Sequence, residues 1–246
     1  MPASMPSAPP PLSVPRLFVP DTLAQGASVA LSPAQAHYLG TVLRAGTGGT
    51  ARLFNGRDGE WLARITALGR GAASLHVAQQ LRPQRPGRDL WLVFALLKRH
   101  ATDLVVQKAT ELGAAALLPV LTGRTNAGRV NEARLTAIAV EAAEQSERLT
   151  VPAIYPPREF GALLDGWDAR RRLVAAVERA ELPGIEPIGT APAALLVGPE
   201  GGFTAAELDA MRLHAFVQPV SLGPLVLRAE TAAIAGLALL QAPARR

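Results

Sequence analysis

The 246-residue sequence contains no cysteine, which excludes disulfide bonds, zinc sites built on thiolates and catalysis by a thiol. Its four histidines, His37, His76, His100 and His214, lack the spacing of metal ligands. No stretch approaches the roughly 20 apolar residues that a membrane helix needs, because charged residues, glycine or proline interrupt each hydrophobic segment. We therefore expect neither a bound metal nor a membrane-spanning helix.

The first residues, MPASMPSAPPPLSVP, also lack the basic and apolar segments of a secretory signal. Their proline, serine and alanine content favours a disordered tail over residues 1–14. We expect a cytoplasmic protein on this basis. With 49% hydrophobic residues, the chain can bury one large core or two modest ones.

Lysine is absent from residues 1–88, where nine arginines face only Asp21, Asp58 and Glu60, for a net charge of +6. Residues 89–246 carry 16 basic and 17 acidic residues, for a net charge of −1. The planar guanidinium of arginine matches phosphate oxygens and can stack on bases. The excess predicts a polyanion-binding N-terminal part, and the alternative is a charged surface that serves only solubility.

Short strand-like runs separated by glycine-rich turns fill residues 16–81, among them RLFVP, SVALS and ASLHVAQQL. The sequence NGRDG separates two runs rich in large apolar residues, which is typical of a hairpin. One short helix is expected within SPAQAHYLGTVLRAGTG, capped by Ser32 and ended at Gly46 or Gly48. These features predict a small, mostly β, barrel-like domain.

The domain boundaries follow from a change of pattern after a segment rich in proline, glycine and arginine. We predict the β domain over residues 15–82, a linker over 83–89 and a second domain over 90–246. In the second domain, continuous apolar runs such as LWLVFALL and AALLPVLT alternate with amphipathic segments such as ATDLVVQKATELG and NEARLTAIAVEAAEQSERL. Such alternation predicts an α/β fold with a mostly parallel sheet, helices on both faces and ligands at the carboxyl ends of the strands. On one helix, Lys108 and Glu111 are expected to form an ordinary surface pair.

The stretch LLVGPEGGFTAAEL reads as a strand, a glycine-rich loop and a helix. Gly198, Gly201 and Gly202 leave room for a ligand to approach the backbone, and Thr204 with Glu207 forms a capping-box pattern at the helix start. The loop lacks lysine and matches neither glycine motif for nucleotide phosphates, which disfavours a phosphate cradle. The alternative is a tight turn and helix cap without a ligand.

A second loop, in VSLGPLVLRAETAAIAGLALL, repeats the arrangement about twenty residues downstream. Glu230 suits the positive end of the following helix, where polar groups satisfy free N–H donors. Arg228 does not, unless a carboxylate or a substrate anion compensates its charge. Arg228 is therefore a candidate functional residue.

Four motifs in a fixed order, QKATELGA, EAAEQSER, LVGPEGGFT and LGPLVLRAETAA, resemble the ribosomal RNA small-subunit (16S) uracil-N3 methyltransferase family of the SPOUT superfamily. The resemblance includes PRLFVP and HYLGTVLRAGTG, so it covers about Pro15 to Gln241. It implies a C-terminal SPOUT domain with a trefoil knot, an N-terminal PUA-like β-barrel for RNA and S-adenosylmethionine as cofactor without a metal. It also implies a homodimer that acts on ribosomal RNA within the small ribosomal subunit.

The resemblance further assigns residues to roles. Cofactor contacts are implied for Leu196, Val197, Gly198, Pro199, Glu200, Gly201, Gly202, Leu222, Gly223, Pro224, Leu227, Thr231 and Ala232. We expect Arg228 to steady the developing uracil oxyanion or a flanking phosphate, and Glu230 to accept the N3 proton. RNA contacts are expected from Arg16, Arg44, Arg57, Arg124 and Arg148.

The sequence departs from the family at two positions, because Leu225 stands where arginine is usual and Ala229 where threonine is common. Arg124 survives in a segment, TGRTNAGRVN, that otherwise differs. Gln145 and Arg148 are either inward-facing polar residues at the cleft or part of a solvated helix face. Two other functions stay open: a SPOUT methyltransferase for a ribose 2′-hydroxyl or a transfer RNA base, and a non-catalytic RNA-binding assembly factor.

Overall fold

The computed structural model describes residues 14–126, 130–178 and 180–242. The predicted tail over residues 1–14 thus lies, apart from Val14, outside the described residues. Within the described part, no helix combines the length and apolarity needed to cross a membrane.

The chain divides into two compact units, Met1–Pro86 and Gly87–Arg246. The division falls inside the linker predicted over residues 83–89. Each unit has its own hydrophobic core, and each is described separately below.

The first unit is built on one five-stranded sheet. Its elements are β1 (Arg16–Phe18), β2 (Ser28–Leu31), α1 (Pro33–His37), the π-helical turn η1 (Tyr38–Val42), β3 (Thr50–Phe54), β4 (Glu60–Gly69) and β5 (Ala72–Arg82). The strand order is β1-β3-β4-β5-β2, and all pairs except β1 with β3 are antiparallel. Three register shifts bend the long β4–β5 hairpin, around a core that includes Leu53 and Leu75. The expectation of a small, mostly β fold is confirmed.

The one helix expected in this unit is shorter than predicted. Ser32 does cap it, since its hydroxyl accepts from the Gln35 N–H while the Gln35 side chain accepts from the Ser32 N–H. The α-helix ends at His37 and continues as η1, and Arg44 then turns the chain with φ 52°. The chain therefore leaves the helix before it reaches the glycines that were expected to stop it.

The second unit alternates strands and helices. Its elements are β6 (Leu90–Ala95), α2 (Arg99–Glu111), β7 (Ala116–Leu121), α3 (Glu132–Gln145), β8 (Ala153–Ile154), β9 (Arg158–Glu159), α4 (Phe160–Asp165), β10 (Arg172–Ala176), β11 (Ala193–Val197), α5 (Ala205–Arg212), β12 (Val217–Val220) and α6 (Ala229–Gln241). The sheet runs β12-β10-β11-β6-β7-β8, with β9 also paired to β7, and every pair is parallel. The predicted mostly parallel α/β sheet is confirmed. The short elements β8, β9 and α4 were not predicted.

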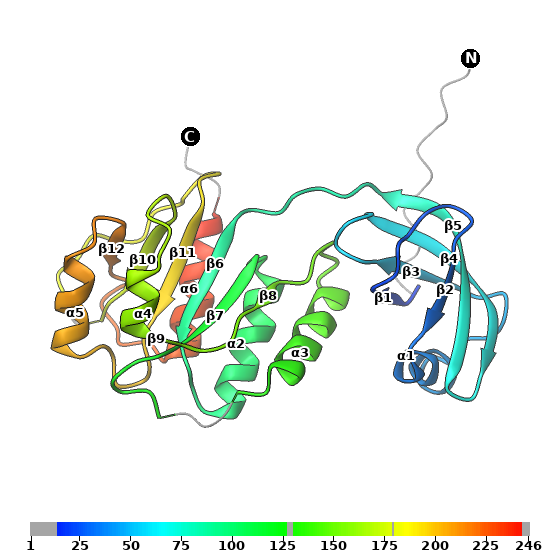
Figure 1. Ribbon diagram of the computed structural model, residues 1–246, viewed down its shortest axis with the longest axis horizontal. Coiled ribbons are helices and arrows are strands. Elements are labelled where there is room, and N and C mark those ends of the chain that lie inside the picture. Colours follow the sequence, from blue (N-terminus) through cyan, green and yellow to red (C-terminus); the bar gives the residue numbers. More distant parts are fainter. Residues whose placement is uncertain (1–13, 127–129, 179, 243–246) are drawn as a thin grey trace, which may run out of the picture. The chain divides into compact units, whose positions relative to one another are not determined.

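Helices cover both faces of this sheet (Figure 1). Successive residues of β11 point to opposite layers: Leu195 joins the core beneath α2, α3 and α6, and Leu196 joins the core beneath α4 and α5. A Cβ on Gly236 of α6 would lie 2.7 Å from Leu195 Cδ2. The glycine therefore permits the close approach of α6 to the sheet.

The connection between β10 and β11 holds the last segment of the chain at both ends. The Ser221 N–H, just after β12, donates to the Pro183 carbonyl at 2.9 Å, and the Ile188 N–H donates to the Leu240 carbonyl near the end of α6 at 3.3 Å. Ile188 is buried in the same core as Leu240. These hydrogen bonds join the β10–β11 connection to the start and to the end of the last segment of the chain.

Candidate active site

The two glycine loops meet beside the carboxyl ends of β10, β11 and β12, where they enclose a cavity of about 240 Å³. Most of the residues predicted to bind cofactor line it: Val197, Gly198, Pro199, Glu200, Gly201, Gly202, Leu222, Gly223, Leu227 and Ala232. Leu196, Pro224 and Thr231 are not part of the lining, and Leu196 is fully buried in the core under α4 and α5. The sequence thus located the cavity and misplaced a few of its neighbours.

The first loop is shaped by its glycines. The Gly202 N–H donates to the Pro199 carbonyl at 2.8 Å, and Gly202 has φ 68°, a conformation that favours glycine. A Cβ on Gly198 would lie 3.0 Å from the buried ring of Phe203. Both positions therefore require a residue without a side chain.

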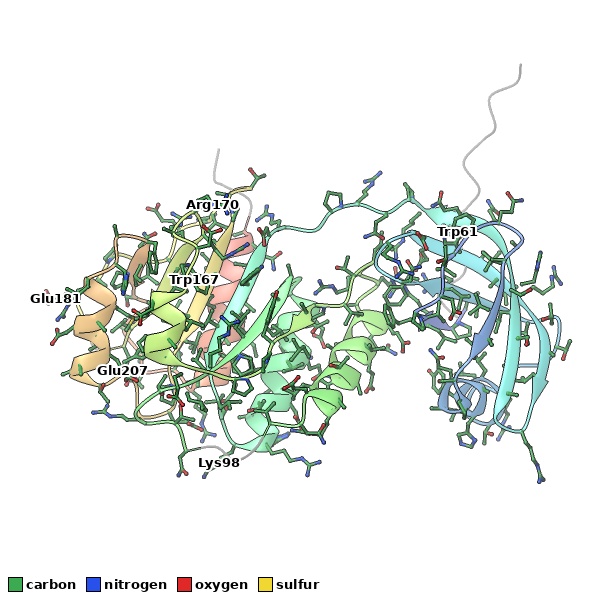
Figure 2. All side chains as sticks on the ribbon, in the orientation of Figure 1. Trp61, Lys98, Trp167, Arg170, Glu181 and Glu207 are labelled. Atoms are coloured by element: carbon green, nitrogen blue, oxygen red, sulfur yellow. The ribbon has the colours of Figure 1, made fainter. Side chains whose placement is uncertain are left out.

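The predicted capping box closes this loop. The Thr204 hydroxyl accepts from the Glu207 N–H, and Glu207 Oε2 accepts from the Thr204 N–H at 2.7 Å. The other carboxylate oxygen of Glu207 accepts from the Gly123 N–H at 2.7 Å. Figure 2 labels Glu207 beside α5. Glu207 therefore joins the loop after β11 to the loop after β7.

Arg124 is one of the residues in the cavity wall. Its Nη1 donates to the Gly201 carbonyl at 2.5 Å, and its Cδ lies 3.3 Å from where a Cβ on Gly201 would be. We predicted an RNA contact for Arg124, and this role stays a prediction. What the structure adds is a place beside the cofactor loop.

Several cavity residues were not predicted from the sequence: Ala176, Val177, Glu178, Phe203, Leu208 and Ala229. Leu225, which stands where the family usually has arginine, also lines the cavity. Glu178 follows β10, and its Oε1 lies 3.0 Å from where a Cβ on Gly202 would be. The available signal was topological, since β10 ends at the same sheet edge as the two glycine loops. The segment after β10 contains no glycine motif that would have drawn attention to it.

The two predicted catalytic residues lie at the start of α6. Arg228 is the N-cap residue, is exposed and makes no side-chain cap hydrogen bond, while Glu230 is half-buried in the first turn. Leu227 and Ala229, which flank Arg228, both line the cavity. Neither Arg228 nor Glu230 is among the residues that line the cavity, and their catalytic roles stay predictions.

Arg16 was expected to contact RNA, but it is 7% exposed. Its Nε donates to Glu60 Oε1 at 2.5 Å, and its guanidinium lies 3.7 Å from the centre of the Phe54 ring. Burial lowers the pKa of Arg16, against the opposing effect of Glu60. This placement contradicts the predicted RNA contact, because the guanidinium is part of the interior of the first unit.

Arg148 was also expected to contact RNA, and it too is committed elsewhere. It donates to the carbonyls of Thr110 and Ala114 at 2.6 and 3.0 Å, and to the Thr150 hydroxyl at 3.0 Å. Burial lowers the pKa of Arg148 to about 10. The side chain therefore ties α3 to the carboxyl end of α2, which contradicts both the RNA contact and the cleft position, and Gln145 is exposed.

The other expected RNA contacts, Arg44 and Arg57, are exposed on the first unit. Arg57 donates one N–H to the Pro20 carbonyl at 3.0 Å, and the guanidinium has four further N–H donors. On α2, Lys108 and Glu111 pair at 2.8 Å, as predicted. Across the residues that the structure describes, no group of three or more histidine, aspartate or glutamate side chains could hold a metal ion.

Comparison with known families settles the kind of protein. A profile for the RNA methyltransferase domain matches residues 83–241, and one for the RNA methyltransferase PUA domain matches residues 31–77. The chain belongs to the RNA methyltransferase family. This methyltransferase is 34% identical to "Ribosomal RNA small subunit methyltransferase E" of Rickettsia conorii, over 91% of this chain and 93% of that protein. It is also 34% identical to the Synechocystis protein of that name, over 92% of this chain and 77% of the relative.

Solved structures resemble this methyltransferase over nearly its whole length. The ribosomal RNA small subunit methyltransferase E of Neisseria gonorrhoeae, bound to S-adenosyl methionine, has a TM-score of 0.80 at 29% identity, over 93% of this chain and 97% of that one. A putative methyltransferase from Legionella pneumophila with bound cofactor SAM has the same TM-score at 28% identity and the same coverage. The expected SPOUT fold with a PUA-like N-terminal domain is confirmed.

Proposed function

We propose that this methyltransferase transfers the methyl group of S-adenosylmethionine to N3 of a uridine in small-subunit (16S) ribosomal RNA. The observation that carries the proposal is that the two glycine loops line the same cavity, beside the carboxyl ends of the parallel strands. The chain belongs to a family of RNA methyltransferases, and two relatives of the same fold have this cofactor bound.

The cavity fits the proposed cofactor. Exposed backbone around Gly198 and Gly223 can hydrogen-bond the edges of an adenine, while apolar side chains such as Leu222 and Leu227 can cover its ring. When bound, the cofactor supplies a methyl group already activated on a sulfonium. The protein therefore needs to orient the uracil and to manage one proton, and it needs no metal.

In this proposal Glu230 accepts the N3 proton, and Arg228 stabilises the negative charge that develops on the uracil. As the methyl group is transferred, the N3 proton passes to the Glu230 carboxylate, the N3 electron pair forms the bond to carbon, and the carbon–sulfur bond breaks to leave a thioether. The guanidinium of Arg228, whose neighbours Leu227 and Ala229 line the cavity, can stabilise the charge on the uracil oxygen or hold a flanking phosphate. Correct orientation alone can contribute about 7 to 11 kcal/mol to lowering the barrier.

The same proposal covers the partners. N3 lies inside a base pair, so the target uridine must be unpaired or flipped out of its stack. The exposed Arg44 and Arg57 of the PUA-like unit are suited to the RNA backbone. We place the reaction on RNA within the small subunit in the cytoplasm, carried out by a homodimer.

The test is incubation of the protein with labelled S-adenosylmethionine and unmodified small subunits, followed by nucleoside mass spectrometry. N3-methyluridine supports the proposal, whereas a ribose-methylated nucleoside would replace it with a different target. A parallel reaction with unmodified transfer RNA tests the other target, and labelling there but not in the small subunits would also replace the proposal. Glu230→Gln is expected to bind cofactor normally in calorimetry and to lose turnover. Full turnover in that variant would remove the assignment of the base, and absence of cofactor binding by the wild-type protein would favour an assembly factor.

A further inference from the structure

Three ionisable side chains line the cofactor cavity: Arg124, Glu178 and Glu200. One is cationic and two are acidic, so the lining carries a net charge of −1. S-adenosylmethionine carries an ammonium, a carboxylate and a sulfonium, for a net charge of +1. The reaction product, S-adenosylhomocysteine, is a neutral thioether at the sulfur and has no net charge. The charge of the lining therefore complements the methyl donor and not the spent product.

The two acidic residues differ in their exposure to solvent. Glu200 is exposed, and water screens its field. Glu178 is half-buried at the end of β10, and its carboxylate lies against the backbone of Gly202. Because a less exposed charge is screened less, Glu178 is the stronger of the two sources of negative potential in the cavity.

Arg124 does not neutralise Glu178. Its hydrogen bonds go to the carbonyls of Gly201 and Phe203 at 2.5 and 3.5 Å. Among the described residues, no hydrogen bond or ion pair is formed by the Glu178 carboxylate. The adjacent glycines Gly201 and Gly202 thus lie against Arg124 and Glu178 respectively, so the Glu178 carboxylate lies beside the loop.

We infer that Glu178 is a specificity-determining residue for the cofactor: its carboxylate selects the sulfonium form of the methyl donor over the neutral thioether product. This inference rests on the proposed function, since it assigns a role within the same cavity. It gives the enzyme a means to bind the donor tightly and to release the product. Glu178 acts through charge, so an amide of the same shape does not replace it.

The test measures affinity by calorimetry for three ligands in the wild-type protein and in Glu178→Gln. The ligands are S-adenosylmethionine, S-adenosylhomocysteine and sinefungin, which carries an ammonium on carbon in place of the methyl sulfonium. We expect Glu178→Gln to weaken the two cationic ligands about tenfold, equivalent to about 1.4 kcal/mol, and the neutral product less than twofold. Glu181→Gln is the matched control, because it removes the same charge from an exposed position outside the cavity lining, and we expect it to change each affinity less than twofold.

The outcomes separate this inference from the proposal on which it rests. Equal weakening of all three ligands by Glu178→Gln would overturn the inference, since the residue would then bind a part common to donor and product, such as the ribose hydroxyls. No change in any affinity would overturn it as well. A wild-type protein that binds none of the three would overturn the proposed function itself. Thermal melting of ligand-free Glu178→Gln verifies that the fold is retained.

Discussion

Replacing Glu60 by alanine should lower the stability of the first unit and leave that of the second unchanged. Glu60 is 2% exposed and accepts hydrogen bonds from Arg16 and Arg82. The Arg16 side chain is only 3% exposed, so Glu60→Ala leaves a buried cation without its carboxylate, a change that typically costs about 3 to 5 kcal/mol. The Arg82 side chain is 40% exposed, and its loss of a partner adds less than about 1 kcal/mol.

We take about 3 kcal/mol, the lower end, because the Arg16 guanidinium retains its position over the Phe54 ring. At about 1.4 kcal/mol per factor of ten, this raises the opening equilibrium constant roughly 150-fold. Hydrogen exchange of the full chain, read by mass spectrometry, should therefore show amides of β3 and β4 exchanging about 100-fold faster, with unchanged rates in β6 and β11.

The control is the double variant Arg16→Met with Glu60→Met. Replacing a buried ion pair by apolar side chains of similar volume is often neutral or stabilising. We expect exchange in β3 and β4 to return part of the way towards the wild-type rate, because the double variant still removes the carboxylate that lies 4.0 Å from the buried Arg52. A single variant that exchanges less than tenfold faster, or a double variant as labile as the single one, would refute the account of Glu60 as the partner of a buried charge.

Glu60 also makes the stability of the first unit depend on pH in the acid range. Burial alone raises the pKa of Glu60, but hydrogen bonds from Arg82 and Arg16 outweigh it, so the pKa in the folded state lies below its ordinary value. A carboxyl group with a lowered folded pKa adds stability above its unfolded pKa of about 4.3, and that stability disappears as the pH falls through the folded value. The protection of amides in β3 and β4, corrected for their intrinsic exchange rates, should thus fall below about pH 4, and Glu60→Gln should reduce this pH dependence.

Three further outcomes are expected. Gly202→Ala should weaken S-adenosylmethionine binding in calorimetry about tenfold, because a backbone with φ 68° costs an alanine about 1 to 2 kcal/mol. The control is Gly189→Ala: Gly189 has a similar φ of 63° but does not line the cavity, so the affinity should stay unchanged. Arg148→Met should lower stability in urea unfolding by about 2 to 3 kcal/mol, since two carbonyls lose a charged donor, and at temperatures where it is folded its RNA affinity should match the wild type. Leu225→Arg replaces a side chain that is 76% exposed, so stability should change by less than about 0.5 kcal/mol; in filter binding, the slope of log affinity against log salt should steepen by about 0.9. An unchanged slope would place Leu225 away from the RNA.

The sequence predicted most of the architecture because local patterns determine it. Buried parallel strands appear as continuous apolar runs, such as the one that became β6, and capping residues such as Ser32 and Thr204 act on N–H groups three residues away. The cavity was also predictable, since the carboxyl ends of parallel strands lie on one edge and the glycines mark the loops after β11 and β12.

The errors concern charged residues whose partners are distant in sequence. The carboxylate that takes Arg16 into the interior is 44 residues away, and the carbonyls that bind Arg148 are 38 and 34 residues away. Composition alone therefore does not tell whether an arginine in a basic segment lies on the surface or in the interior. Glu178 was missed for the complementary reason, because its position beside Gly202 depends on how β10 and β11 pair.

The position of the second glycine loop near the end of the chain has a consequence for biosynthesis. Leu222, Leu227 and Ala232, which complete the cavity, come late in translation, after the β10–β11 connection that is hydrogen-bonded to their segment. A chain that stops short of residue 222 has the first loop but no opposing wall. Because the first unit is compact by itself, such a fragment is expected to keep that unit and to lack a complete cavity, so a premature stop codon should abolish methyl transfer and not merely weaken it.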